Sequence, residues 1–156
     1  MTSAQTSFPR LFTEIDQLTR ADHWYLEEDD ICWFLGDYTV RGTYKHGPTN
    51  ALIWNFKKPM SKRGLPEWYY KGKAITDAAT AVSNALKSVD TQGCTFVPIP
   101  PSAAKGTVEY DDRVTQMLCA IRPAIDAREL VNQSDSRPPA HLSDGKRNPE
   151  EYVARY

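Results

Sequence analysis

The residues best suited to bind a charged ligand follow an apolar, proline-rich stretch at residues 96–101. Ser102, Lys105 and Gly106 come directly after it, in a segment that otherwise holds two alanines. A loop of small residues lets backbone N–H groups approach an anion, and Lys105 adds a positive charge. This pattern favours a site for a phosphate or pyrophosphate group. Lys105 is equally compatible with a plain solvated loop, because lysine is common on surfaces.

Two arginines are further candidates. Arg147 lies near the start of a helix predicted from Asn148 onward, where its guanidinium can point at a phosphate group. The alternative is an ordinary surface residue that pairs with Asp144. Arg113 is interpreted as a salt-bridge partner on a helix face rather than as a ligand contact.

The histidines and cysteines do not predict a metal site. The chain has three of each, and none are spaced as zinc ligands require. Four consecutive acids at residues 27–30 are typical of a solvated run. The cysteines stand alone among apolar neighbours, which predicts buried free thiols in a reducing compartment. We therefore expect a cytoplasmic protein without a metal centre of its own.

The charge balance argues against a nucleic-acid or membrane partner. With 19 basic and 20 acidic residues the net charge is -1, so bulk attraction to polyanions is absent. The basic residues at 57–63 are interpreted as a solvated loop that keeps a strand edge soluble. Nucleic-acid binding through residues 57–73 is the weakest alternative. No signal peptide or apolar run of membrane-spanning length is found in the sequence.

The N-terminal third predicts short elements. Apolar positions in residues 8–20 have the spacing of an amphipathic helix. The compact runs at residues 31–35 and 51–56 each predict a buried strand. Because Gly47 and Pro48 break the chain between them, we expect the two strands to form an antiparallel pair.

The second half predicts an α/β fold. Alanine-rich residues 69–88 form the clearest helix of the sequence. A short buried strand at residues 95–99 follows, and then a helix capped by Asp111 or Asp112. This order is typical of an α/β layer. The expected fold is therefore α/β, with a partly parallel sheet flanked by helices.

The ordered series of motifs resembles the type I phosphoribosyltransferases, above all their ComF-like branch. Val-Pro-Ile-Pro at residues 97–100, with the loop after it, is similar to the family's first core strand and its pyrophosphate-facing loop. Residues 51–58 and the helix after Tyr69 resemble its hood-side strand, basic turn and helix. Leu-Ser-Asp-Gly-Lys-Arg-Asn at residues 142–148 resembles the stretch before its central strand.

The resemblance implies an incomplete type I phosphoribosyltransferase-like fold, with a hood at residues 1–50 and a core portion at residues 51–156. It implies a small phosphorylated, nucleotide-type ligand such as phosphoribosyl pyrophosphate (PRPP) or pyrophosphate, which Mg²⁺ usually accompanies in that family. The residues that would contact this ligand are Ser102, Lys105, Gly106 and Arg147.

Two features of the family are not found in the sequence. No paired cysteines form its N-terminal zinc ribbon, and no hydrophobic strand with an acidic, Thr/Gly-rich PRPP loop follows Arg147. We therefore expect transferase activity only if the natural protein is longer or is complemented by another chain. The alternative is a non-catalytic interaction module, because an incomplete sheet exposes an edge that a partner or a second copy can cover.

Overall fold

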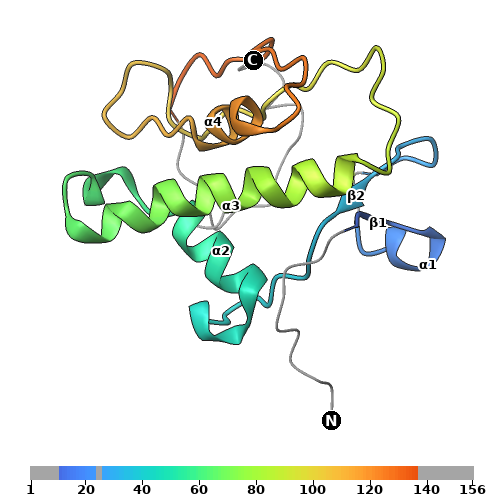
Figure 1. Ribbon diagram of the computed structural model, residues 1–156, viewed down its shortest axis with the longest axis horizontal. Helices are drawn as coiled ribbons and strands as arrows, with labels where there is room; N and C mark the ends of the chain where they lie inside the picture. Colours follow the sequence, from blue (N-terminus) through green and yellow to red (C-terminus); the bar gives the residue numbers. More distant parts are fainter. Residues whose placement is uncertain (1–10, 24–25, 137–156) are drawn as a thin grey trace.

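The computed structural model describes residues 11–23 and 26–136 (Figure 1). The elements in chain order are β1 (Thr13–Glu14), α1 (Gln17–Arg20), β2 (Trp33–Phe34), η1 (Tyr44–His46), α2 (Pro48–Phe56), η2 (Met60–Lys62), η3 (Pro66–Trp68), α3 (Tyr69–Leu86) and α4 (Arg113–Ala120), where η denotes a 3-10 helix. The described part of the chain is thus mainly helical, with one small antiparallel sheet.

Helix α3 is the centre of the molecule and confirms the predicted helix at residues 69–88. It lies between α2 on one side and α4 on the other, as Figure 1 shows. The core sits between α3 and α4, where Ala79, Leu118 and Ile121 are buried together. Small alanines on the inner face of α3 let the two helices approach closely.

The predicted strand at residues 95–99 is reduced to a single parallel bridge. The Phe96 N–H donates to the Asp126 carbonyl at 2.8 Å, and the Arg128 N–H donates to the Phe96 carbonyl at 3.0 Å. The two bridged segments precede and follow α4, so the chain forms a segment–helix–segment crossover. Among the described residues this bridge takes the place of the partly parallel sheet that we expected, so the fold is not a clear parallel-sheet phosphoribosyltransferase fold.

The predicted strand at residues 51–56 is wrong, because these residues belong to helix α2. Short apolar runs do not distinguish a strand from a buried helix by their period. Pro48 supplies the deciding signal, since proline fits the first turn of a helix. Gly47 precedes it with a φ of 134°, a conformation that glycine adopts readily. Helix α2 also spans the boundary that we expected between a hood at residues 1–50 and a core portion at residues 51–156. That division into two parts stays a prediction.

The N-terminal segment also differs from the expectation. A helix at residues 8–20 is replaced, in the described part, by β1 and the single turn α1. The Asp16 carboxylate starts that turn by accepting from the N–H groups of Leu18 and Thr19 at 3.0 and 2.9 Å. The predicted strand at residues 31–35 is present in part as β2, but its antiparallel partner is β1.

The cysteines are less buried than we expected. Cys94 and Cys119 are exposed, and Cys32 is half-buried. Cys32 and Cys94 lie outside the helices and strands, so their apolar sequence neighbours were a poor guide to burial. No helix in the described ranges is both long and apolar enough to cross a bilayer.

Candidate functional site

A cavity of about 430 Å³ lies beyond the carboxyl ends of the two bridged segments. It is lined by Lys57, Pro59, Met60, Ser61, Pro101, Ser102, Ala103, Glu109, Asp111, Arg113 and Ser136. We call it the Arg113 cavity. Ligands of open α/β sheets bind outside the carboxyl ends of parallel strands, so its position matches the one expected for the loop after residue 101.

A buried ion pair forms the floor beneath this cavity. The Lys71 ammonium, only 3 % exposed, lies 2.7 Å from Oδ2 of Asp111. It also donates to the carbonyl oxygens of Phe56 and Lys58, each at 2.9 Å. Lys71 therefore ties the end of α2 to the start of α3 and to the residues before α4. Because all its donors have acceptors, the ammonium can stay charged in the interior.

Burial lowers the pKa of Lys71 below its ordinary value of 10.5, while the hydrogen bond and the charge of Asp111 oppose that effect. Asp111 also pairs with Arg113, whose Nη1 contacts the same oxygen, Oδ2. Two cations, Lys71 and Arg113, thus share one carboxylate beside the cavity.

The Arg113 guanidinium has donors left beyond its ion pair with Asp111. It lies over the ring of Phe56, 5.7 Å from the centroid, and lines the cavity. Its Nε is buried and has no hydrogen-bond partner among the described residues. A buried donor without an acceptor costs free energy, so the guanidinium would gain by meeting an anion.

The loop after the proline-rich stretch is held in place by polar contacts. Gln133 donates to the Ser102 carbonyl at 2.9 Å, and the Ala104 N–H donates to Ser136 Oγ at 2.9 Å. Ser102 lines the Arg113 cavity, as an anion-facing residue should. Its hydroxyl and the cationic Arg113 therefore face one space from separate parts of the chain.

The structure does not bring every predicted site residue to this cavity. Lys105 lies 2.7 Å from Oε2 of Glu129, and this contact raises the pKa of Lys105. Gly106 adopts a φ of 93°, which suits glycine in a turn. Neither of these residues lines the cavity. Arg147 lies outside the described residues. The ligand roles of these three residues stay predictions.

Sequence reasoning missed the part played by Lys71 and Arg113. Arg113 does pair with an acid, as we expected, but that acid is buried and faces the cavity. Lys71 and Asp111 are 40 residues apart, so no local pattern predicts their contact. The available signal was the cluster of acids and a base at residues 109–113, directly after the loop and before a helix.

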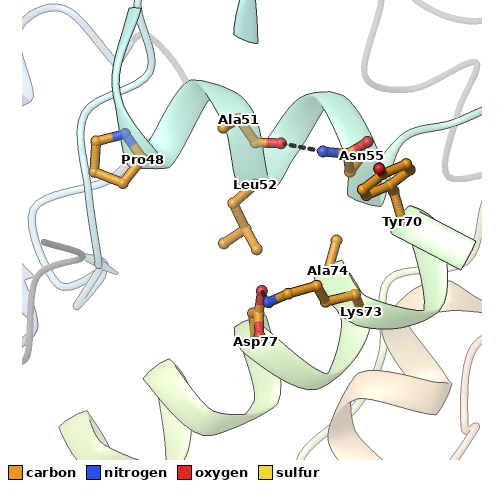
Figure 2. A pocket seen from close by; sticks show the side chains of 8 residues that line it. All are labelled: Pro48, Ala51, Leu52, Asn55, Tyr70, Lys73, Ala74 and Asp77. Atoms are coloured by element: carbon orange, nitrogen blue, oxygen red, sulfur yellow. Dashed lines mark hydrogen bonds and ion pairs between the residues drawn. The ribbon is translucent and has the colours of Figure 1, made fainter. Parts of the chain in front are cut away.

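An apolar groove of about 440 Å³ also lies between α2 and α3 (Figure 2). Leu52 and Ala74 face one another across it. Lys73 and Asp77 are joined at 2.6 Å on one side, and the Asn55 amide donates to the Ala51 carbonyl at 3.0 Å. Its polar side chains are thus engaged within their own helices, so the groove offers less to a charged ligand than the Arg113 cavity does.

In the described ranges, no three or more His, Cys, Asp or Glu residues are grouped so that they could hold a metal ion. Comparison of the chain with protein-family models, with curated proteins and with solved structures gave no match. A functional assignment for this chain therefore rests on the geometry of its cavities.

Proposed function

We propose that the Arg113 cavity binds the phosphate or pyrophosphate group of a nucleotide-type ligand of the PRPP class. The observation that carries this proposal is the Arg113 side chain, which lines the cavity and whose buried Nε–H donor has no acceptor among the described residues. Planar guanidinium groups bind phosphate oxygens in pairs, with charge-assisted hydrogen bonds.

The side chains around the cavity offer donors to an anionic ligand. Lys57 and Arg113 line it, and Glu109 and Asp111 balance their charges. Asp111 is already engaged by both Lys71 and Arg113. The Ser61, Ser102 and Ser136 hydroxyls can supply further hydrogen bonds to phosphate oxygens.

Magnesium would enter this cavity together with the ligand's phosphates. Mg²⁺ in such sites is held by one or two carboxylates and by substrate phosphates. Asp111 is already engaged by two cations, so Glu109 is the carboxylate that would meet the ion. The proposal is limited to binding, and a transferase reaction would need groups beyond those that the described residues provide.

Isothermal titration calorimetry with pyrophosphate and with PRPP, each with and without Mg²⁺, tests the proposal. Arg113→Gln should weaken binding at least roughly tenfold, because charge-assisted hydrogen bonds contribute about 1.5–3 kcal/mol. Ser102→Asp, which places a carboxylate in the lining, should weaken it as well. The matched control is Arg128→Gln, since Arg128 is exposed and pairs with Asp126 away from the cavity.

Equal affinities for wild type, Arg113→Gln and Ser102→Asp, with circular dichroism showing folded proteins, would remove the proposed site. Ser102→Asp keeps the test decisive if Arg113→Gln does not fold, because it leaves the contact between Arg113 and Asp111 in place.

A second candidate function is an interaction module whose sheet is completed by a partner or a second copy. The observation in its favour is exposed apolar surface on the bridged segments, where Ile99 is 78 % and Leu130 is 65 % exposed. Such surface favours association. Light scattering after size exclusion should then show a dimer that Ile99→Lys and Leu130→Lys convert to a monomer. A wild-type monomer at all concentrations would exclude self-association.

A further inference from the structure

A cavity of about 540 Å³ opens at the C-terminal end of α2, and it shares Lys57 and Pro59 with the Arg113 cavity. Its aromatic and charged lining consists of Tyr38, Trp54, Lys57, Lys58, Lys62 and Glu67. We call it the Trp54 cavity. Its volume is within the range of about 300–1,000 Å³ that small-molecule sites and ligand clefts occupy.

The aromatic rings of this cavity are unusually open to solvent. Trp54 is 57 % exposed and Tyr38 is 49 % exposed. Tyr44, 52 % exposed, stands beside Trp54 with its ring centroid 6.4 Å away. Large aromatic side chains normally bury most of their surface, so three half-exposed rings beside α2 indicate a surface for stacking.

The same part of the chain is strongly basic, although the whole protein is not. Residues 38–66 contain six lysines and arginines and no aspartate or glutamate. Glu67 is the acid in the cavity lining, and it pairs with Lys62 at 3.2 Å. The net charge of -1 therefore conceals a local excess of cations, which the structure places around exposed aromatic rings.

We propose that the Trp54 cavity and the basic surface around it bind single-stranded nucleic acid. An unpaired base stacks on the Trp54 ring, and Lys57, Lys58 and Lys62 contact the phosphates on either side of it. Proteins that bind single strands combine these two features, a stacking aromatic and a cationic path for the backbone. A duplex would present no free base face to the tryptophan.

A strand fits this surface better than a single nucleotide does. The cations are spread from Arg41 to Arg63 along the chain, and more of them are present than one phosphate group can use. The proposal is independent of the function proposed for the Arg113 cavity. Because Lys57 lines both cavities, the residues to change are Trp54 and Lys62, which line only this one.

Fluorescence anisotropy with labelled single-stranded oligonucleotides of about 15 nucleotides tests the proposal, since known sites cover about 4–16 nucleotides. Binding should be detected at about 50 mM salt and should weaken steeply at about 200 mM salt. Trp54→Ala should reduce affinity roughly tenfold, because stacking contributes about 1–3 kcal/mol per base. Lys62→Gln should lower the slope of log affinity against log salt by about 0.7.

Two controls change the same residue types elsewhere. Trp33→Ala removes a 47 % exposed tryptophan of β2, and Lys87→Gln removes an exposed lysine beyond the end of α3. Both should bind the oligonucleotide as the wild type does. Equal losses in Trp54→Ala and Trp33→Ala would overturn the assignment of the stacking site.

Competition assays distinguish a single strand from two other ligands of the Trp54 cavity, a mononucleotide and a duplex. Adenosine monophosphate and a duplex of the same length should compete at least roughly tenfold more weakly than the single strand, since neither offers both a free base face and a row of phosphates. If the mononucleotide competes equally, the cavity is a nucleotide pocket and the proposal fails. Absence of binding at the lowest salt would also overturn it.

Discussion

Two regions of the molecule are held together in different ways. One is the helical unit, which consists of α3, α4 and the bridge at Phe96. The other is the N-terminal segment, described at residues 11–23 and 26–46. The helical unit buries apolar side chains, with Ile121 at 1 % and Leu118 at 8 % exposure. The N-terminal segment leaves Leu18 88 % exposed. There Ile15 is buried at 6 % exposure, and local polar contacts, such as the Arg20 guanidinium on the carbonyl oxygens of Glu27 and Asp30, also organise the chain. Most of the stability therefore resides in the helical unit, which supplies Arg113 to the Arg113 cavity.

The largest expected effect comes from breaking the buried ion pair of the helical unit. Asp111→Ala leaves Lys71 and Arg113 facing each other without a counter-charge. We expect a loss of about 3–5 kcal/mol in the free energy of unfolding, measured with urea. Asp77→Ala removes an exposed carboxylate from the pair with Lys73 and should have little effect. Similar losses in both variants would show that Asp111 is not the anchor we describe.

The comparison of the two regions is tested directly by two apolar truncations. Ile121→Ala should cost about 2–5 kcal/mol, because it opens a cavity in the core between α3 and α4. Leu18→Ala, on the exposed turn α1, should change stability by less than about 0.5 kcal/mol. If Leu18→Ala proved as costly as Ile121→Ala, the N-terminal segment would have to bury more than the structure shows.

Asn50 of α2, which is 3 % exposed, joins that helix to the N-terminal segment. Its Oδ1 accepts from the Thr39 N–H at 3.0 Å, and its Nδ2 donates to the carbonyl oxygens of Thr39 and Gly42. Asn50→Ala leaves these groups without partners, at a cost of about 1–3 kcal/mol. Hydrogen exchange at residues 39–42 should accelerate more than exchange in α3. Asn84→Ala, at an exposed site, serves as the matched control.

The smallest expected effect is a change in pH dependence. Hydrogen bonds from Lys105 and Thr115 lower the pKa of Glu129 below its ordinary value of 4.5. The stabilisation is present above that value and is lost as the pH falls through the lowered pKa, because the unfolded chain then binds more protons. Wild type should thus lose more stability than Glu129→Gln between about pH 6 and about pH 3. Parallel stability curves for both proteins would contradict this assignment.

The sequence predicted the regular parts of the helical unit and little else. Helix α3 extends over 18 residues with a clear alanine-rich face, so its period was readable. Residues 51–56 of α2 are apolar apart from Asn55, and that short run fits a strand as well as a helix. In the N-terminal segment, a side chain that caps a turn at Asp16 outweighed the apolar spacing.

The predicted ligand residues and the described lining of the Arg113 cavity overlap only at Ser102. The proline-rich stretch located the loop with Ser102, which does line the Arg113 cavity. Lys71 and Asp111 meet only because α3 packs beside the residues that precede α4, a contact that depends on the whole fold. The 57 % exposure of Trp54 could not be predicted, since sequence alone does not show which face of α2 is open.

The most direct test of the central claim is the ¹H–¹⁵N resonance of the Arg113 Nε–H group, assigned by its absence in Arg113→Gln. Pyrophosphate added in the presence of Mg²⁺ should shift this resonance, because the Arg113 guanidinium gains an anionic partner. The Arg128 resonance should stay in place, as that side chain already pairs with Asp126. An unchanged Arg113 resonance in the folded protein at saturating pyrophosphate would contradict an anion site in the Arg113 cavity.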